Sequence, residues 1–415
     1  MRSTMHDEAT RVPLKGRSSR LPFVVYALAL GTFLMLTTEF VVAGILPDIA
    51  TDLQVSVARA GTLITVFAIG MIVGAPLMAM LTLRMPRRVT LMLALGVFAV
   101  GHVIVAAGSD FGVLLAARFL TALATGAFWA VAAVVATRVA GPGAASRAVG
   151  VVNAGGMLAT VLGVPLGALL GQFVGWRGTF WALAILAVVA IPMIARHVPR
   201  GGADHGSVSI RSELAALNSG RLWLALATCA ATTGGVLAAY SYITPLLTER
   251  TGIPANLVPL VLAGFGVGSL VGSLLGGRVG DIRPHTATIV APLVTALILT
   301  ALALVAGASI PTTILLILLG LFGLGANPVL ISLAVRYAAH APTLGSSLSV
   351  AAFNLGTAIA SWIGGIALGT GPGTTGPVLV GAVIAALTLI PATALALIQR
   401  GRAAEAIPEP VNALT

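Results

Sequence analysis

Long apolar stretches separated by short polar breaks make up most of the chain. An α-helix rises 1.5 Å per residue, so about 20 apolar residues cross the ~30 Å hydrocarbon core of a bilayer. The pattern predicts twelve such helices, at residues 22–46, 59–83, 89–108, 111–138, 148–171, 178–196, 221–247, 256–279, 287–307, 312–336, 345–368 and 377–399. Polar breaks such as LRMPRR (83–88) do not fit in lipid. The weakest breaks are 107–111 and 307–311, and losing both would leave ten helices.

The composition excludes a soluble protein. Of the 415 residues, 58% are hydrophobic and 8% are charged, whereas a soluble globular chain carries roughly 25% charged residues. So few charges do not cover a water-facing surface, and we expect an all-α integral membrane protein. The single cysteine, Cys229, lies in an apolar run without a partner, which excludes a disulfide framework and a cysteine metal site.

The net charge of +11 would suit a nucleic-acid partner, but the basic and aromatic platforms for nucleic acid are absent. The basic residues gather instead on one side of the predicted membrane. With both termini inside, nineteen Lys and Arg fall inside and only Arg59, Arg177 and Arg250 fall outside, with Arg118 within a span. This positive-inside bias predicts a multi-pass protein of the cytoplasmic membrane with both termini in the cytoplasm.

The longest polar interruption lies near the midpoint and divides the spans six and six. We therefore expect a tail, a six-helix bundle, a cytoplasmic loop, a second six-helix bundle and a tail, at residues 1–20, 21–196, 197–220, 221–400 and 401–415. The two tails have the composition of disordered segments. The first apolar stretch contains Glu39 and has no A-x-A cleavage site at its C-terminal end, which favours a retained helix over a signal peptide.

The connection between the second and third spans has the same form in both halves, as GAPLMAMLTLRMPRR (74–88) and GSLLGGRVGDIRPH (272–285). Two homologous halves around a central site are a common transporter plan. The six-plus-six topology and this connection resemble the major facilitator superfamily, whose signature here is roughly G-x-x-x-D-[RK]-x-G-[RK]-[RK]. The residues that match are Gly277, Asp281 and Arg283 in the second half and Arg84, Arg87 and Arg88 in the first, where Leu83 stands at the acidic position.

Three further spans carry motifs similar to those of the same family. Arg118 opens RFLTALATGAFWA in the fourth span, which looks like the second motif of the family. The fifth span resembles the antiporter motif of drug–proton exporters through Gly163, Pro165 and Gly167. The first span, TEFVVAGILPDIATDL (38–53), resembles the chloramphenicol-resistance and arabinose-efflux-like permeases of bacteria. The resemblance covers nearly the whole chain and implies the major facilitator fold and drug–proton antiport in a bacterial membrane.

Only Glu39 and Arg118 are charged residues well within predicted spans. A charge at mid-bilayer costs roughly 2.5–3.5 kcal/mol on insertion scales, so such residues need a partner, water or a task. The first span runs outward and the fourth inward, which puts both residues in the outer half at similar depth. One hypothesis is that Glu39 carries the coupling proton and that Arg118 and hydration control its ionisation. The alternative is a permanent Glu39–Arg118 ion pair that only fixes helix packing.

Glycines recur every fourth residue in two spans. The eighth span contains Gly264, Gly268, Gly272, Gly276 and Gly280, and the fifth contains Gly163, Gly167, Gly171 and Gly175. Strips of small residues let helices approach closely in lipid, so we expect packing in the eighth span. In the fifth span, Pro165 removes a backbone hydrogen bond and permits a kink, which favours a pivot or seal between the halves.

A few neutral polar residues within spans are candidates for the substrate cavity. They are Asn153, Tyr240, Tyr242, Asn327 and Asn354, with Thr232 and Thr233 beside them. Hydrogen bonding between helices is the alternative for each. His102 is alone on the third span, which is typical of a packed neutral imidazole.

We therefore expect a proton-coupled exporter of small, mainly apolar molecules, chloramphenicol-like drugs among them, in which two halves rock around a cavity. An exporter of a sugar or another metabolite is the alternative, although the spans are sparse in hydrogen-bonding groups. An enzyme is not expected, because H-E-x-x-H and converging ionisable groups are absent. A passive channel would differ by flux that does not depend on a pH gradient. We expect no cofactor and no metal, and substrate, protons and lipid as the partners of a monomer.

Overall fold

The computed structural model describes residues 21–81, 85–141, 144–199, 216–338 and 342–405. Those residues form helices and turns without a strand, and twelve helical segments are long and apolar enough to cross a membrane. The predicted count of twelve is therefore confirmed, including the helices on both sides of the two weak breaks.

Six spans form each half. The first half contains α1 (Phe23–Asp52), α2 (Val57–Leu81), α3 (Arg87–Ala107), α4 (Phe111–Ala140), α5 (Ala145–Leu158), the π-helical turn η2 (Ala159–Gly163), α6 (Val164–Val174) and α7 (Trp176–His197). The second contains α9 (Gly220–Tyr240), α10 (Ile243–Pro245), η4 (Leu246–Arg250), α11 (Val258–Ile282), α12 (Pro284–Val305), α13 (Ser309–Gly323), α14 (Asn327–Tyr337), α15 (Pro342–Leu368), α16 (Gly376–Leu387) and α17 (Leu389–Glu405).

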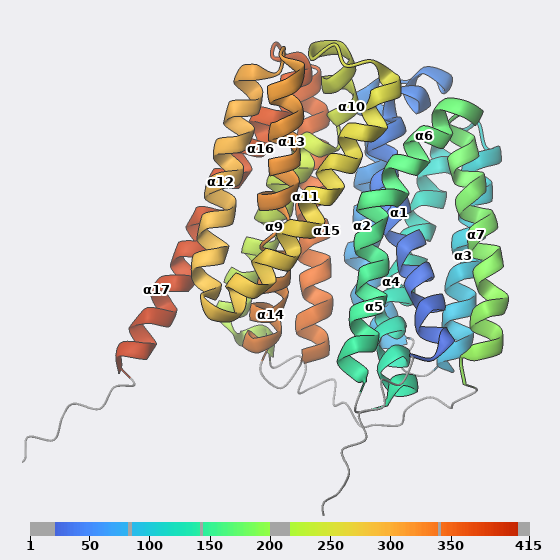
Figure 1. Ribbon diagram of the computed structural model, residues 1–415, viewed down its shortest axis with the longest axis vertical. Coiled ribbons are helices and arrows are strands. Elements are labelled where there is room, and N and C mark those ends of the chain that lie inside the picture. The colour runs from blue at the N-terminus through green and yellow to red at the C-terminus, as the bar shows by residue number, and fades with distance from the viewer. Residues whose placement is uncertain (1–20, 82–84, 142–143, 200–215, 339–341, 406–415) are drawn as a thin grey trace, which may run out of the picture.

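Successive spans run in opposite directions, so α1 begins and α17 ends at the same end of the bundle, at the bottom of Figure 1. We call this the termini end and the opposite one the far end. Helix α17 continues to Glu405, beyond the predicted span end at 399. The α1 helix is also longer than predicted and reaches Asp52 at the far end.

Four spans are interrupted, and each interruption lies three or four residues before a proline. Three of the interruptions include the residue four before a proline, namely Val161 before Pro165, Ser241 before Pro245 and Leu324 before Pro328, and the fourth, Thr388, lies three residues before Pro391. Proline lacks an N–H group and its ring clashes with the carbonyl four residues earlier, which explains the position of each break. The predicted spans at 221–247, 312–336 and 377–399 are thus each present but divided into two helical pieces. Four other prolines lie within unbroken helices, so proline alone does not decide the outcome.

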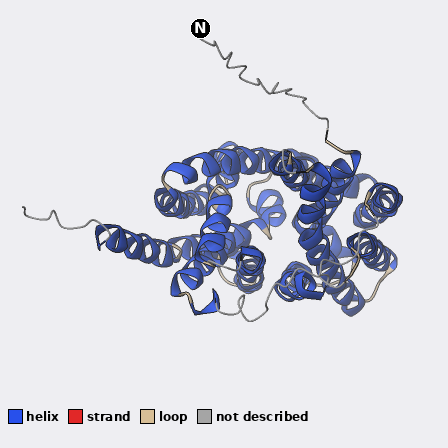
Figure 2. Ribbon diagram, turned by 90° about the horizontal axis from the view of Figure 1, so that it is seen from below, coloured by secondary structure: helices blue, strands red, loops and turns tan. Residues whose placement is uncertain are grey.

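The two halves share one hydrophobic core at the far end and have separate cores at the termini end. The far-end core joins residues of α1 such as Ile45 and Leu46 to Leu246 and Leu262 of the second half. At the termini end, one cluster contains only first-half residues and another only second-half residues. Figure 2 views the molecule from this end and shows the two groups of helices side by side.

Both glycine strips are packing surfaces within a half. A Cβ at Gly268, Gly272 or Gly276 would lie within 2.2 Å of the backbone of α13 or the turn after it, so α11 and the tenth span are in backbone contact. The α5–α6 strip faces α1, where Gly163, Gly167 and Gly171 contact Thr37, Val41 and Ile45. The expected packing role of the eighth span is confirmed. The strip of the fifth span packs inside the first half, while the π turn and α6 also reach the second half, where Gly266 lies against Thr160 and the Ala255 carbonyl oxygen accepts from Gln172.

Candidate functional site

Arg118 is fully buried in the middle of the first half. Its side chain extends from α4 to α1, where Nη1 donates to the carbonyl oxygen of Thr38 at 3.1 Å and to Thr38 Oγ1 at 2.9 Å. Nε points at the Leu63 carbonyl oxygen on α2 at 3.5 Å. The guanidinium carbon lies 4.2 Å from the ring centre of Phe67, also on α2. Arg118 therefore connects α4 to both α1 and α2.

One guanidinium nitrogen of Arg118 has no partner among the described residues. Nη2 is buried and makes no hydrogen bond. Leaving a buried donor unpaired costs about 1–3 kcal/mol, and more for a charged group. A negatively charged or strongly accepting group placed beside Nη2 would recover that energy.

A chain of hydrogen bonds fixes the orientation of the Thr38 hydroxyl. His102 Nδ1 lies 2.7 Å from the carbonyl oxygen of Phe98, which only accepts, so Nδ1 carries the proton in the neutral ring. His102 Nε2 then accepts from Thr38 Oγ1 at 2.7 Å. The hydroxyl proton of Thr38 therefore points to His102, and its lone pairs face Arg118. His102 is buried and stacked on Phe98, in agreement with the packed neutral imidazole expected from the sequence.

Glu39 follows Thr38 on α1 and is only partly buried. It makes no hydrogen bond or ion pair with the residues that the structure describes, although Arg118 is close enough to interact with it electrostatically. The two residues lie at the same depth, as their positions along the spans predict. The carboxylate is thus near a buried cation without being bound to it.

The far end is closed by contacts between the halves that centre on Tyr242. Its ring lies between Gly61 of α2 and Gly365 of α15, and its hydroxyl donates to the Ser361 carbonyl oxygen at 2.8 Å. The Ser361 hydroxyl also lies 2.8 Å from the hydroxyl of Thr65 on α2. In the adjacent turn, Thr244 Oγ1 donates to the Ala43 carbonyl oxygen of α1 at 2.8 Å. We call these contacts the far-end seal.

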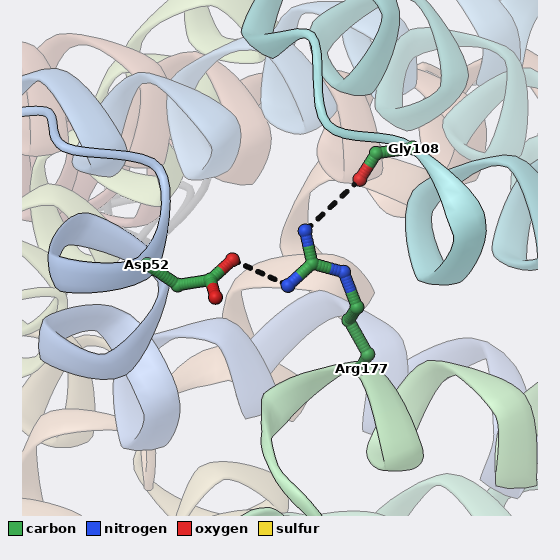
Figure 3. Close-up of polar contacts among 3 residues, drawn as sticks. All are labelled: Asp52, Gly108 and Arg177. Atoms are coloured by element: carbon green, nitrogen blue, oxygen red, sulfur yellow. Dashed lines mark hydrogen bonds and ion pairs between the residues drawn. The ribbon is translucent and has the colours of Figure 1, made fainter.

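A second set of contacts holds the far end of the first half together. Arg177, at the start of α7, forms an ion pair with Asp52 at the end of α1 and donates to the carbonyl oxygen of Gly108 (Figure 3). The guanidinium also lies 4.3 Å from the ring centre of Trp176. These bonds join three separate segments of one half and do not cross to the other.

The five candidate cavity residues do not form one cluster. Tyr242 belongs to the far-end seal, and Tyr240 is buried with its ring 4.4 Å from Phe265. Asn354 is buried, donates to its own helix at Val350, and has an Oδ1 atom without a partner among the described residues. Asn327 Oδ1 at the start of α14 is likewise unpartnered. Asn153 is exposed and lies two helical turns before Thr160, on the same face of the helix. Thr160 contacts Gly266 of α11.

The signature residues between the second and third spans lie at the termini end. Arg84 is outside the described residues, and Arg87 and Arg88 begin α3. In the second half, Asp281 is exposed at the end of α11 and makes no ion pair within the described part of the chain. A Cβ at Gly277 would meet nothing within 4 Å, and Arg283 caps α11.

Thr38 and Phe67 are the residues at this site that the sequence did not single out. Thr38 directly precedes the one carboxylate deep within a span, so its depth was available from the sequence. Phe67 is one of thirteen phenylalanines, and nothing in the pattern separates it from those that face lipid. Among the described residues, no three His, Cys, Asp or Glu side chains form a group that could hold a metal ion.

Comparison with known proteins agrees with this architecture. The sequence model of the family described as Major Facilitator Superfamily matches residues 28–343. The chain is 36% identical to a chloramphenicol resistance protein of Streptomyces lividans, over 89% of this chain and 95% of that protein. It is 34% identical to the inner membrane transport protein YdhP of Escherichia coli K12, over 89% and 95%. A crystal structure of a D-xylose–proton symporter has the same fold, with a TM-score of 0.72 and 15% identity over 90% of this chain and 96% of that chain.

Proposed function

Because the chain belongs to the Major Facilitator Superfamily, a family of membrane transporters, we propose that it exports small, mainly apolar molecules in exchange for protons. The observation that carries this proposal is Glu39, a carboxylate without a bound partner among the described residues, beside the buried cation Arg118. In a bundle with few other charges, this pair is the natural place to load and release a proton.

The proposed mechanism is alternating access between two halves. A shared core at the far end and separate cores at the termini end correspond to a state that is closed at the far end. The charge distribution supports a cytoplasmic termini end, so this state would receive substrate from the cytoplasm. Breaking the far-end seal and joining the cores at the termini end would expose the same site to the outside.

The proton cycle then follows from the position of Glu39. The carboxylate accepts a proton in the state open to the outside and releases it in the state open to the cytoplasm. A membrane potential of ~100 mV supplies about 2.3 kcal/mol for one charge, enough for roughly fifty-fold accumulation of substrate.

The substrate class rests on two observations. The similarity to a chloramphenicol resistance protein supports chloramphenicol-like compounds, and the apolar spans suit weakly polar molecules. The second candidate is a sugar or another hydroxylated metabolite, which the unpartnered oxygens of Thr232, Thr233, Asn327 and Asn354 favour because hydroxyl groups of a substrate could donate to them.

Transport into inverted vesicles tests the proposal. Vesicles containing the protein are energised with an imposed pH gradient, and uptake of labelled chloramphenicol and labelled xylose is measured separately. We expect chloramphenicol uptake that collapses with the gradient, and Glu39→Gln should retain expression while losing dependence on the gradient. Gradient-driven uptake that Glu39→Gln leaves unchanged would contradict the coupling role. Uptake of xylose alone would select the second candidate.

A further inference from the structure

One turn of α2 contacts the buried arginine on one side and the second half on the other. Leu63 and Phe67 are four residues apart and share the face that meets Arg118, through a carbonyl oxygen and a ring. Thr65 lies between them on the opposite face, where its hydroxyl is 2.8 Å from the hydroxyl of Ser361 on α15. The segment Leu63–Phe67 is thus in direct contact with both partners.

The side chain of Phe67 also lies between Arg118 and the second half. Its buried ring belongs to a cluster with Met71 and Ala122 of the first half, and Val350 of α15 packs against that cluster. The ring therefore has the guanidinium of Arg118 on its face and a side chain from the other half beside its cluster. A movement of α15 away from α2 would remove the support on the second-half side.

We propose that Phe67 is a positioning residue that couples the docking of the two halves to the protonation of Glu39. With α2 docked on α15, the ring and the Leu63 carbonyl hold the guanidinium against Thr38, next to Glu39. When α2 separates from α15, the ring is free to turn and the cation is held less firmly. This inference rests on the proposed proton coupling and names the residue that would transmit it.

Few other charged groups could produce the same effect. The ionisable side chains close to the pair are His102, which is engaged with Thr38 and Phe98, and Tyr240, which reaches α1 through Phe40. Helix α15 carries no ionisable side chain, and α2 carries only Arg59 near the far end. The second half therefore influences Glu39 mainly through packing, and Phe67 is in position to transmit it.

Infrared titration of Glu39 tests the inference without a transported substrate. The protein is reconstituted in lipid, the carboxylic acid band is followed against pH, and Glu39→Gln identifies the band. Phe67→Leu removes the aromatic face and keeps an apolar side chain. We expect the midpoint of the Glu39 titration to move by about half a pH unit to one unit, and Phe67→Tyr, which keeps the ring, to restore it. Phe128→Leu is the matched control, because Phe128 is equally buried and contacts neither Arg118 nor α15 in the described structure.

A second variant separates coupling from local damage. Thr65→Val removes the hydroxyl that meets Ser361 and leaves every contact of Arg118 in place, while Ser361 keeps its bond to Ala358. We expect it to move the Glu39 midpoint in the same direction as Phe67→Leu. Midpoints unchanged in both variants, or moved equally by Phe128→Leu, would overturn the role of Phe67 and leave the proton coupling intact. A parent protein in which the Glu39 band does not titrate would overturn the proposed function as well.

Discussion

The two halves of the molecule bury different kinds of unsatisfied polar atoms. Within the described residues of the first half, these are donors, Arg118 Nη2 and Trp176 Nε1. In the second half they include the oxygens of Thr232, Thr233, Asn327 and Asn354. Charged side chains in the described spans of the second half lie only near helix ends. One half is thus suited to a negative charge, and the other to a neutral ligand that exchanges hydrogen bonds with hydroxyl and amide oxygens.

This difference suggests a division of tasks between the halves. The first half would carry the proton, because it holds the carboxylate, the cation and the bonds that orient them. The second half would contribute to substrate selection, because its unpartnered oxygens would discriminate among ligands by hydrogen bonding. Variants that change one property and leave the other untouched test this division of tasks.

The largest effect is expected from Arg118→Leu. The change removes the cation, three hydrogen bonds and the contact with Phe67. We expect gradient-driven uptake of chloramphenicol in inverted vesicles to fall by about a hundredfold, as for loss of a group that acts in every cycle. Arg177→Leu is the control for loss of an arginine from the same half. If both variants lose transport equally, the special role of the buried cation is refuted.

A smaller loss is expected where the halves meet, from Gly61→Ala. The added Cβ would lie 2.2 Å from the Tyr242 hydroxyl, so the ring could no longer seat between Gly61 and Gly365. Transport should fall about tenfold, because a few kcal/mol of clash shifts the population away from the closed far end. Opening of the far end would be measured as a faster reaction of a thiol-reactive probe with the cysteine of a Thr62→Cys variant. Gly96→Ala, where a Cβ meets nothing within 4 Å, should behave as the parent.

In the second half, Thr233→Val should alter substrate affinity alone. The hydroxyl of Thr233 is buried and has no partner in the described part of the chain, so the isosteric change removes an unsatisfied group and should not lower the melting temperature. We expect KM to rise three- to tenfold with the pH profile unchanged. Thr228→Val is the control, because that hydroxyl already donates to Leu224 and should not meet substrate. A shifted pH profile in Thr233→Val would contradict the division of tasks, because a second-half residue would then affect the proton step.

Arg177→Leu should have the smallest effect. Both partners of the ion pair are substantially exposed, with 32% and 44% of the side-chain surface accessible. Such pairs contribute about 0.2–1 kcal/mol. The melting temperature should fall by a few degrees at most and transport should stay within twofold of the parent. A large loss would mean that the far end of the first half needs this ion pair to keep its shape.

The sequence predicts the spans well because length and hydropathy decide membrane insertion. It also gives the depth of Glu39 and Arg118, since rise per residue is constant. It does not reveal that Arg118 bonds to Thr38 and stacks on Phe67, because those contacts depend on helix rotation. The breaks at Ser241 and Leu324 were accessible through the prolines that follow them, but Pro47 and Pro76 occur in unbroken helices, so the pattern alone is ambiguous.

Glycines on two faces of α11 have a consequence for the distance between the halves. On one side, Gly268 and Gly272 lie against the backbone of α13, and on the other, Gly266 lies against the backbone of Thr160 in the π turn η2. At this level a single main chain, without intervening side chains, sets the separation between the tenth span and the first half. A methyl group at any of these glycines would collide with backbone atoms of the neighbouring helix. Because no side-chain rotamer change could relieve that collision, the two helices would have to move apart.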